Sequence, residues 1–381
     1  MPKRVVVIGG GVGGTFVANK LVNKTFDVVR RKELEVVVIE PADRLVYQPG
    51  FLYVPFKALT PDVMFRSPKS VYHPLVRHIP KSADRIDMRE KKVVLEDGEV
   101  LTYDYLVVAT GLEVKVDHFP GFKKTWYTLW TYEGAKAFRD ALWKFGGGTF
   151  VFSVASTPFK CPVAPYEFLL MFDDWLMARG LKGKVKTIYT VVAPHLHAQP
   201  NVNKFIAKEM EMRGIEYHTK FEVNEVGEGY ISGTRQIKAD LIHIVPKHLP
   251  PAVIMKSELY STKGVGGVPV DRHTLEIEGG SGVEYAVGDV TNLAVPKAGS
   301  VAHFQAEVVA TRIYEDLSYG HADTQYNGRV MCFVITGLEE ATQISWNYDT
   351  PALYPPTPSR YYMMAKELTN TSIWGAMRCG L

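Results

Sequence analysis

A glycine-rich turn between an apolar strand and a helix constrains this chain more than any other feature of its sequence. The run GGGVGG (Gly9–Gly14) follows the apolar segment Val5–Ile8 and precedes a stretch with helical character. In such a turn Gly9 allows a tight bend, Gly11 lets backbone amides approach a pyrophosphate, and Gly14 lets the helix pack against the strand. The turn therefore predicts a Rossmann-like domain that binds a dinucleotide.

An acidic residue at the end of the next strand supports this prediction. The apolar segment Glu35–Ile39 ends in Glu40, where a carboxylate can accept hydrogen bonds from a ribose. The alternative is an ordinary strand-turn-helix unit with a surface glutamate. The two signals in sequence favour the dinucleotide site.

Length and composition exclude several classes of protein. A chain of 381 residues predicts two or three domains, and 46% apolar with 22% charged residues is typical of globular proteins. A net charge of +3 without a basic stripe argues against nucleic-acid binding. No stretch reaches the roughly 18 consecutive apolar residues of a membrane-spanning helix, and no signal peptide precedes the first strand. We therefore expect the protein to stay on the cytoplasmic side of the membrane.

The cysteines are too few and too scattered for a structural role. Cys161, Cys332 and Cys379 form neither a disulfide scaffold nor a C-x-x-C metal motif. We expect no metal site, and we expect chemical roles for any cysteine that functions.

The pattern of elements predicts four segments. These are a first part of the dinucleotide domain (1–110), a second Rossmann-like domain (111–246), a return to the first domain (247–325) and a C-terminal unit (326–381). The second segment has helical periodicity at 133–144, 165–179 and 202–213 and apolar strands at 148–154 and 184–191. A hairpin is expected at 91–104 around Asp97-Gly98, and an aromatic loop over a site at 47–56.

Two further motifs, in this order after the glycine turn, resemble the flavoproteins that have two dinucleotide-binding domains. One is the strand YDYLVVATG, which ends in Thr110 and Gly111, and the other is VEYAVGDV, which contains Gly288 and Asp289. The resemblance implies an α/β fold of the disulfide-reductase type with FAD bound along these motifs. Taken singly, the strand end is more often simple packing and Asp289 more often a helix cap.

The second domain lacks the glycine loop that would bind NAD(P)H. After the strand at 149–154 the sequence reads ASTPFKCPVAPYEF, which contains prolines and Cys161 but no glycine. A pyrophosphate would meet side chains there. The sequence therefore predicts an electron donor other than a nicotinamide.

The segments PFKCPVAPYEF (Pro158–Phe168) and YNGRVMC (Tyr326–Cys332) resemble the sulfide:quinone oxidoreductase and flavocytochrome c sulfide dehydrogenase family. The resemblance implies a redox pair of Cys161 and Cys332, with Glu167 as an acid/base and Lys297 near the flavin. His195 and His197 are further candidates for proton transfer. On the residues alone, a buried cysteine is more often a small hydrophobic side chain, Glu167 a helix-start charge, and a turn histidine simply solvated.

This resemblance predicts that the enzyme oxidises sulfide to sulfane sulfur or polysulfide and passes the electrons through FAD to a membrane quinone. A quinone could stack among the aromatic residues at 47–56, and the helix at 167–177 suits either the core or a membrane interface. The expected anchor is an aromatic tail beside Lys366 and Arg378, which would hold a peripheral protein at the cytoplasmic face of the membrane. Its residues are Tyr361, Tyr362, Met364, Trp374 and Met377.

Alternative functions remain open at this stage. Many members of the quinone-reducing branch have a further cysteine where this chain reads KTWYTLWTYEG (Lys124–Gly134). The chain could therefore be a flavocytochrome c-type sulfide dehydrogenase subunit, a type II NADH:quinone oxidoreductase or a flavin-binding scaffold. Homo-oligomers are compatible with the sequence, and Cys379 near the end is best explained as a tolerated thiol.

Overall fold

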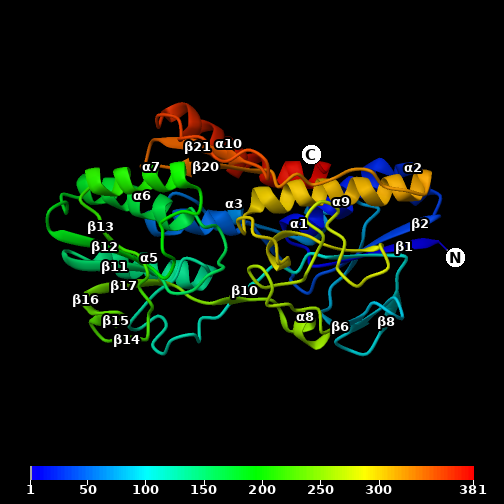
Figure 1. Cartoon of the computed structure of the whole chain (residues 1–381), viewed down its shortest axis with the longest axis horizontal. Helices are drawn as coiled ribbons and strands as arrows, with labels where there is room; N and C mark the ends of the chain where they lie inside the picture. Colours follow the sequence, from blue (N-terminus) through cyan, green and yellow to red (C-terminus); the bar gives the residue numbers. More distant parts are fainter. Residues whose placement is uncertain (1) are drawn as a thin grey trace.

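The computed structural model describes residues 2–381 and contains two parallel sheets side by side, joined across one edge by the C-terminal segment. Figure 1 shows the first domain, with the N-terminus, on the right and the second domain on the left. The segment coloured orange to red runs over both of them. This arrangement places the C-terminal unit where it contacts both domains.

The first domain is built on a five-stranded parallel sheet in the order β19-β9-β1-β2-β5. Its strands are β1 (Lys3–Ile8), β2 (Leu34–Ile39), β5 (Arg77–Ile79), β9 (Tyr105–Val108) and β19 (Glu284–Ala286). The central strands are apolar on both faces because helices cover the sheet. Strand β19 comes late in the chain, so this domain is assembled from two segments.

Helices α1 (Val12–Lys24) and α9 (Gly299–Tyr319) pack against each other on the first sheet. The predicted hairpin is confirmed, as β7 (Lys92–Leu95) pairs with β8 (Val100–Thr102), and β7 also pairs with β6 (Ala83–Asp87) on its other side in an antiparallel sheet. Short elements complete the domain. They are α2 (Phe26–Arg30), β3 (Leu45–Val46), α3 (Pro61–Met64), β4 (Phe65–Arg66), α4 (Pro68–Val71), α8 (Ala252–Lys256) and the 3-10 helix η2 (Gly288–Val290).

The second domain has a four-stranded parallel sheet in the order β13-β12-β11-β17. The strands are β11 (Gly148–Val154), β12 (Val185–Val191), β13 (Glu216–His218) and β17 (Leu241–Val245), and the helices are α5 (Tyr132–Lys144), α6 (Ala164–Ala178) and α7 (Pro200–Met212). A small antiparallel sheet of β14 (Glu225–Gly227), β15 (Tyr230–Ser232) and β16 (Gln236–Lys238) lies beside it. Of the two interpretations of the helix at 167–177, the core is correct, because α6 is buried along most of its length.

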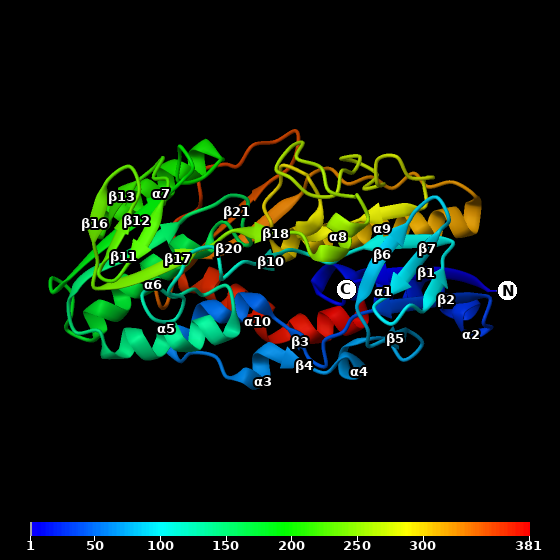
Figure 2. The same ribbon diagram turned by 90° about the horizontal axis from the view of Figure 1, so that it is seen from below.

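The chain crosses between the domains at two adjacent strands. It leaves the first domain through β10 (Glu113–Val114) and returns through β18 (His248–Leu249), and these two strands pair with each other. Figure 2 shows both strands between the two sheets. The domains are therefore linked by hydrogen-bonded strands rather than by loose linkers.

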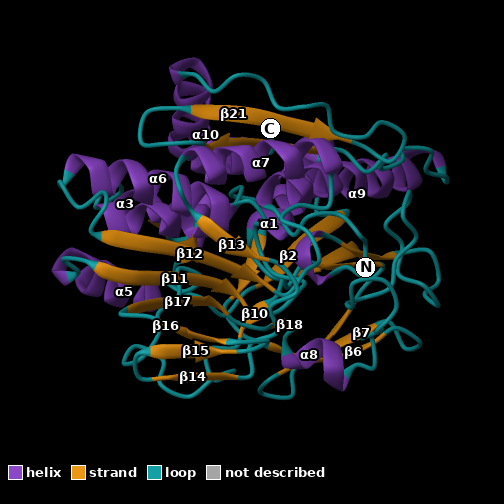
Figure 3. Cartoon of the chain, turned by 60° about the vertical axis from the view of Figure 1, so that its left-hand side comes forward, coloured by secondary structure: helices purple, strands orange, loops and turns teal. Residues whose placement is uncertain are grey.

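The C-terminal unit is a hairpin of β20 (Val330–Ile335) and β21 (Ala341–Trp346) followed by helix α10 (Arg360–Cys379). Figure 3 shows α6 and α7 between the second sheet and this hairpin. The prediction of a wholly membrane-facing tail is wrong for Trp374 and Met377, which are buried in the core of the first domain. The Trp374 indole donates a hydrogen bond to the Val63 carbonyl, and Arg378 donates one to the Ser70 carbonyl. No helix within the described residues has the length and apolar character needed to cross a membrane.

The aromatic segment after β3, which the sequence predicts as a loop over a site, is a buried 3-10 helix. This helix, η1 (Gln48–Phe56), buries Phe51, Leu52, Tyr53 and Val54 against the second domain. Its apolar composition reflects this packing, because exposing these side chains would cost the free energy of their burial.

We predict opposite effects on stability from two glycine substitutions. A Cβ on Gly14 would lie 1.9 Å from the Gly9 carbonyl oxygen, whereas a Cβ on Gly375, in the exposed middle of α10, would meet nothing within 4 Å. Gly14→Val should therefore lower the free energy of unfolding by about 3 kcal/mol or more. Gly375→Ala should raise it by roughly 0.5–1 kcal/mol, because alanine restricts the unfolded chain. Guanidinium unfolding measures both, and equal effects would contradict the predicted packing of α1 on β1.

Candidate functional site

The glycine turn forms one wall of a cavity. Gly9 has a φ of +100°, and a Cβ there would lie 2.5 Å from the Ala109 carbonyl oxygen, so the bend requires glycine. A Cβ on Gly11 would meet nothing within 4 Å, because that position faces the cavity. Glu40 accepts a hydrogen bond from the Gly10 N–H at 2.7 Å and one from Ala42 at 2.9 Å. The carboxylate is thus held at the cavity wall by backbone donors.

The cavity has a volume of about 370 Å³ and is lined by both domains and by α10. Most of the residues predicted from sequence lie on it. They are Gly9, Gly11, Glu40, Thr110, Gly111, Cys161, Glu167, Gly288, Asp289 and Lys297. Gly14 lies behind the wall, where it allows α1 to approach β1. Cys332 and His197 are outside the lining.

The residues present fit an extended dinucleotide. The Thr110 hydroxyl oxygen is buried on the lining and has no hydrogen-bond partner within residues 2–381, so it is available to a ligand. Helix α9 begins at Gly299 on the lining, and no side chain caps its first amides. The glycine turn and the start of α9 together offer donors to the pyrophosphate and to a second polar region of FAD.

Buried charges gather around Asp289. Burial raises the pKa of the Asp289 carboxyl, and the charges of Lys160 and Lys297 oppose this rise. Burial also lowers the pKa of Lys297 to about 8, although Asp289 acts against it. The Lys297 ammonium donates to the carbonyls of Thr291 at 2.6 Å and Leu293 at 3.4 Å. This ammonium is therefore tied to the backbone behind the cavity wall.

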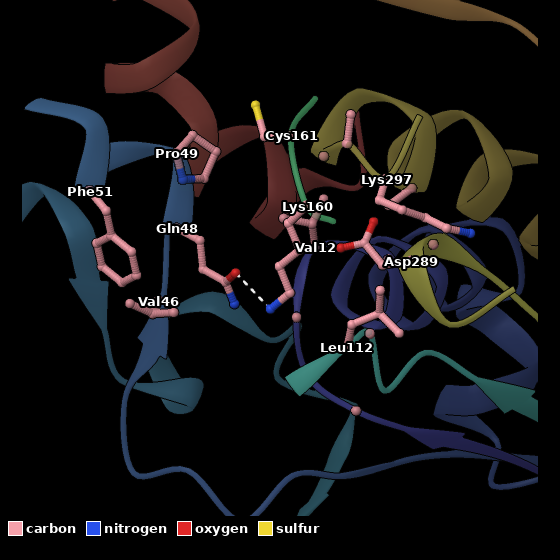
Figure 4. A pocket seen from close by; sticks show the side chains of 18 of the residues that line it. Val12, Val46, Gln48, Pro49, Phe51, Leu112, Lys160, Cys161, Asp289 and Lys297 are labelled. Carbon is pink, nitrogen blue, oxygen red and sulfur yellow. Dashed lines mark hydrogen bonds between the residues drawn. The ribbon is translucent and has the colours of Figure 1, made fainter. Parts of the chain in front are cut away.

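A second cation, which the sequence interpretation did not single out, reaches the cavity. Figure 4 shows the side chains of Lys160 and Gln48 pointing toward each other, with the Lys160 Nζ donating to the Gln48 Oε1 at 3.0 Å. Burial lowers the pKa of Lys160, and the nearby Asp289 opposes this shift. The signal for Lys160 was its place directly before Cys161 in the motif.

The loop between β11 and α6 carries Cys161 across to the first domain. The Cys161 N–H donates to the Lys297 carbonyl at 2.6 Å, and the Cys161 carbonyl accepts from Ala164 at 2.9 Å. Cys161 has a φ of +54°, in the left-handed region that costs free energy for a residue with a side chain. Backbone hydrogen bonds on both sides hold this conformation. The position of a nucleotide-binding loop is thus occupied by a cysteine at the FAD cavity.

Cys332 lies on β20 and, like Cys161, is a free thiol in this structure. Its Sγ is 3.6 Å from the Ser300 hydroxyl on the first turn of α9. Burial raises the pKa of both thiols, and the charges of Glu167 and Lys366 act on both. The two cysteines therefore share one charged environment although they come from different domains.

That environment is a buried ion pair between α6 and α10. The Glu167 Oε1 accepts from the Lys366 ammonium at 3.1 Å and from the Ile335 N–H at 3.0 Å, and Lys366 also donates to the Phe333 carbonyl at 3.1 Å. Only 1% of the Glu167 side chain is exposed. Burial acts to lower the pKa of Lys366, but Glu167 and the neighbouring buried groups hold it above its ordinary value.

The expectation that Lys366 faces a membrane surface is wrong, because the ion pair keeps it inside the protein. Helical spacing was the signal that could have found it. Lys366 lies between Met363 and Asn370, and all three are on the face of α10 that continues to Trp374 and Met377. A lysine on an otherwise buried face indicates a buried partner.

His197 is not brought to the cavity. It is 7% exposed, and its Nδ1 accepts from the Gln199 N–H at 3.0 Å. Burial lowers its pKa to about 4, so the imidazole is neutral at pH 7. Its ring contacts Trp346 edge to face, with 5.6 Å between the ring centroids. A role for His197 or His195 in proton transfer stays a prediction.

Helix η1 gives the cavity an apolar side. Phe51 and Leu52 of η1 line it, together with Val46 of β3 and with Leu129 and Trp130 from the second domain. Two tyrosines hold η1 against α10, since Tyr47 donates to the Asn370 Oδ1 at 2.7 Å and Asn370 donates to the Tyr53 hydroxyl at 2.8 Å. An apolar wall beside buried charges suits a flat ring with polar substituents.

Comparison with known proteins identifies relatives along the whole chain. The family model described as pyridine nucleotide-disulphide oxidoreductase matches residues 3–306. The mitochondrial sulfide:quinone oxidoreductase of Dictyostelium discoideum is 25% identical over 99% of this chain and 86% of its own length. The sulfide-quinone reductase of Aquifex aeolicus is 29% identical over 51% of this chain and 44% of its own length.

Among solved structures, the sulfide:quinone oxidoreductase from Aquifex aeolicus superposes with a TM-score of 0.85 at 21% identity. The match covers 99% of this chain and 92% of the other. This likeness confirms the predicted α/β fold of the disulfide-reductase type.

We predict that the Glu167–Lys366 pair stabilises the protein only as a pair. Glu167→Gln should leave the Lys366 charge buried without a counter-ion and lower the free energy of unfolding by about 3–5 kcal/mol, and Lys366→Met should do the same for Glu167. The double variant should lose much less free energy of unfolding than the sum of the two single losses, and a double-mutant cycle in guanidinium unfolding measures the difference. The exposed pair of Glu133 and Lys136 is the control, since Lys136→Met should cost less than about 1 kcal/mol. If Glu167→Gln and Lys366→Met each lowered the free energy of unfolding by no more than Lys136→Met does, the prediction of a stabilising buried pair would be contradicted.

Proposed function

The chain belongs to the pyridine nucleotide-disulphide oxidoreductase family, and from this premise we propose that it oxidises sulfide and passes the electrons to a quinone. Membership confirms the predicted oxidoreductase with FAD as its cofactor. One observation supports the sulfide substrate most strongly. The loop that would bind a nicotinamide dinucleotide instead carries Cys161 to the FAD cavity.

The cofactor would be held by residues from both parts of the first domain. Gly9, Gly11 and Glu40 would bind its pyrophosphate and ribose, with Thr110 and Asp289 further along the cavity. When bound, FAD supplies a two-electron acceptor next to the cysteines and a donor for the quinone.

The sulfur chemistry proposed for this site begins with the oxidised Cys161/Cys332 pair. Hydrosulfide forms a bond to one sulfur while the bond between the cysteines breaks, which leaves one persulfide and one thiolate. Lys366 stabilises negative charge on either sulfur, because its ammonium acts on both thiols. Glu167 lies at the same cavity with an oxygen that can hold a proton in this exchange, and this supports its assignment as the acid/base.

The quinone would lie against the apolar side of the cavity. Phe51 and Trp130 offer flat surfaces for ring stacking, and Lys366 lies on the same cavity as a donor toward a quinone oxygen.

The length of the sulfur product, sulfane sulfur or polysulfide, depends on how far a chain of sulfur atoms can grow between the two cysteines.

We predict that sulfide, and not NADH, bleaches the FAD absorbance under anaerobic conditions. Cys161→Ser and Cys332→Ser should each slow sulfide reduction by about 10³-fold or more, because each removes one sulfur of the pair. Cys379→Ser is the matched control and should reduce at the wild-type rate, since Cys379 is exposed at the end of α10. Stopped-flow absorbance measures all three. Reduction by NADH at the rate seen with sulfide would instead support a type II NADH:quinone oxidoreductase.

We also propose that the outer face of α10 contacts a membrane surface, where a quinone is available. Tyr361, Met364 and Leu368 are 75%, 67% and 68% exposed, and their spacing of three and four residues places them on one side of the helix. Apolar side chains exposed in a row are typical of interfacial helices. The cytoplasmic face stays a prediction.

We predict that Tyr361→Ser, Met364→Ser and Leu368→Ser, combined in one variant, reduce binding to liposomes by about 10-fold or more. The buried face of α10 is unchanged, so sulfide should still bleach FAD at the wild-type rate, while reduction of a quinone embedded in the liposomes slows. Met255→Ser on α8 is the control, because Met255 is 54% exposed on another element. Equal flotation of the triple variant and the control would contradict this membrane contact.

A further inference from the structure

We propose that Ser300 is a positioning residue for Cys332. The Ser300 hydroxyl donates a hydrogen bond to the Cys332 sulfur when that sulfur is a thiolate. The inference rests on the proposed function for its role in sulfur chemistry. The hydrogen bond itself can be tested without sulfide or a quinone.

The contact between the two side chains joins α9 to β20. The Ser300 Oγ lies 3.6 Å from the Cys332 Sγ, and within residues 2–381 this sulfur is the hydroxyl's hydrogen-bond partner. Between a thiol and a hydroxyl either atom can donate. A thiolate has no proton, so in that state Ser300 must be the donor. A donor to the charged form favours that form.

The position of Ser300 on its helix strengthens the effect. Ser300 is in the first turn of α9, which begins at Gly299 with Ala298 as its N-cap and has no side-chain cap. The free amides of a helix start carry partial positive charge. The Cys332 sulfur lies at this end of the helix because Ser300 contacts it directly.

The two cysteines have unequal surroundings. Burial raises the pKa of Cys161 and the charge of Glu167 raises it further, while the Lys366 charge and a backbone hydrogen bond from Ala164 act in the opposite direction. Burial raises the pKa of Cys332 too, but the Ser300 hydrogen bond and the Lys366 charge act in the opposite direction, with a smaller contribution from Glu167. The charged and titratable groups around Cys332 are thus Glu167 on α6, Lys366 on α10 and Cys161 itself.

The contact concerns one thiol only. The Ser300 hydroxyl can stabilise a thiolate on Cys332, and a thiolate is the reactive form of a cysteine. The charge of Lys366 acts on both sulfurs, so it does not distinguish them. Ser300 contacts only one.

The test uses proteins with a single cysteine, loaded with FAD. Cys161→Ser with Cys379→Ser leaves Cys332 as the one thiol of the three in the chain. Alkylation of Cys332 by iodoacetamide, followed by mass spectrometry across pH 6 to 12, gives its apparent pKa separately from the limiting rate at high pH. Adding Ser300→Ala should raise that pKa and slow alkylation at pH 7 by about 3- to 10-fold. Ser300→Thr keeps a hydroxyl, so its pKa and alkylation rate should stay close to those of the protein with Ser300.

The reciprocal protein is the specificity control. With Cys332→Ser and Cys379→Ser, the alkylation profile of Cys161 should not change on Ser300→Ala. An unchanged pKa of Cys332 in Ser300→Ala overturns the inference, and so does an equal shift at Cys161. A change confined to the limiting rate, with no shift in pKa, also overturns it, because it reports access only.

The outcomes separate this inference from the proposed function. If sulfide fails to bleach FAD while the Cys332 profile still depends on Ser300, the sulfide proposal fails and the hydrogen bond stands. If sulfide bleaches FAD through both cysteines while the alkylation profile of Cys332 does not depend on Ser300, the sulfide proposal stands and the inference about the hydrogen bond fails.

Discussion

The buried ion pair between Glu167 and Lys366 is the interaction on which the rest of the site depends. It joins α6 of the second domain to α10, and through the Ile335 amide and the Phe333 carbonyl it also fixes β20. Two charges removed from water are tolerated only when each finds a partner with good geometry. Because these three elements come from distant parts of the sequence, the pair also brings them together next to the two cysteines, on which both charges act.

Under the proposed function, a change in one loop would separate this chain from a nicotinamide-binding protein with the same topology. In an open α/β sheet, ligands bind beyond the carboxyl ends of the strands, and the loop after β11 lies at such a position. Here that loop has a left-handed Cys161 held by the Lys297 carbonyl in place of glycines. The fold thus keeps its sheet and replaces the chemistry of one edge, which illustrates that function is determined by the site rather than by the fold.

Local patterns predicted most of the architecture. The glycine turn, the acid at the end of β2 and the Asp97-Gly98 hairpin each depend on neighbouring residues, and each is found where it was expected. The errors concern contacts between distant segments. Trp374 and Lys366 look like membrane anchors when α10 is considered alone. Only the packing on the first domain shows that Trp374 is buried, and only Glu167 shows that Lys366 points inward to an ion pair. Lys160 was missed because its partners, Gln48 and Asp289, are far from it in sequence.

The two faces of helix α10 differ in composition and, under the proposed function, in role. Its inner face carries Lys366 to the cavity wall, with Met363 and Asn370 on the same face, and Asn370 holds η1 through Tyr47 and Tyr53. Its outer face exposes Tyr361, Met364 and Leu368. Since adjacent positions of one helix face the two sides, any surface that binds the outer face lies about one helix diameter, roughly 10 Å, from the ion pair.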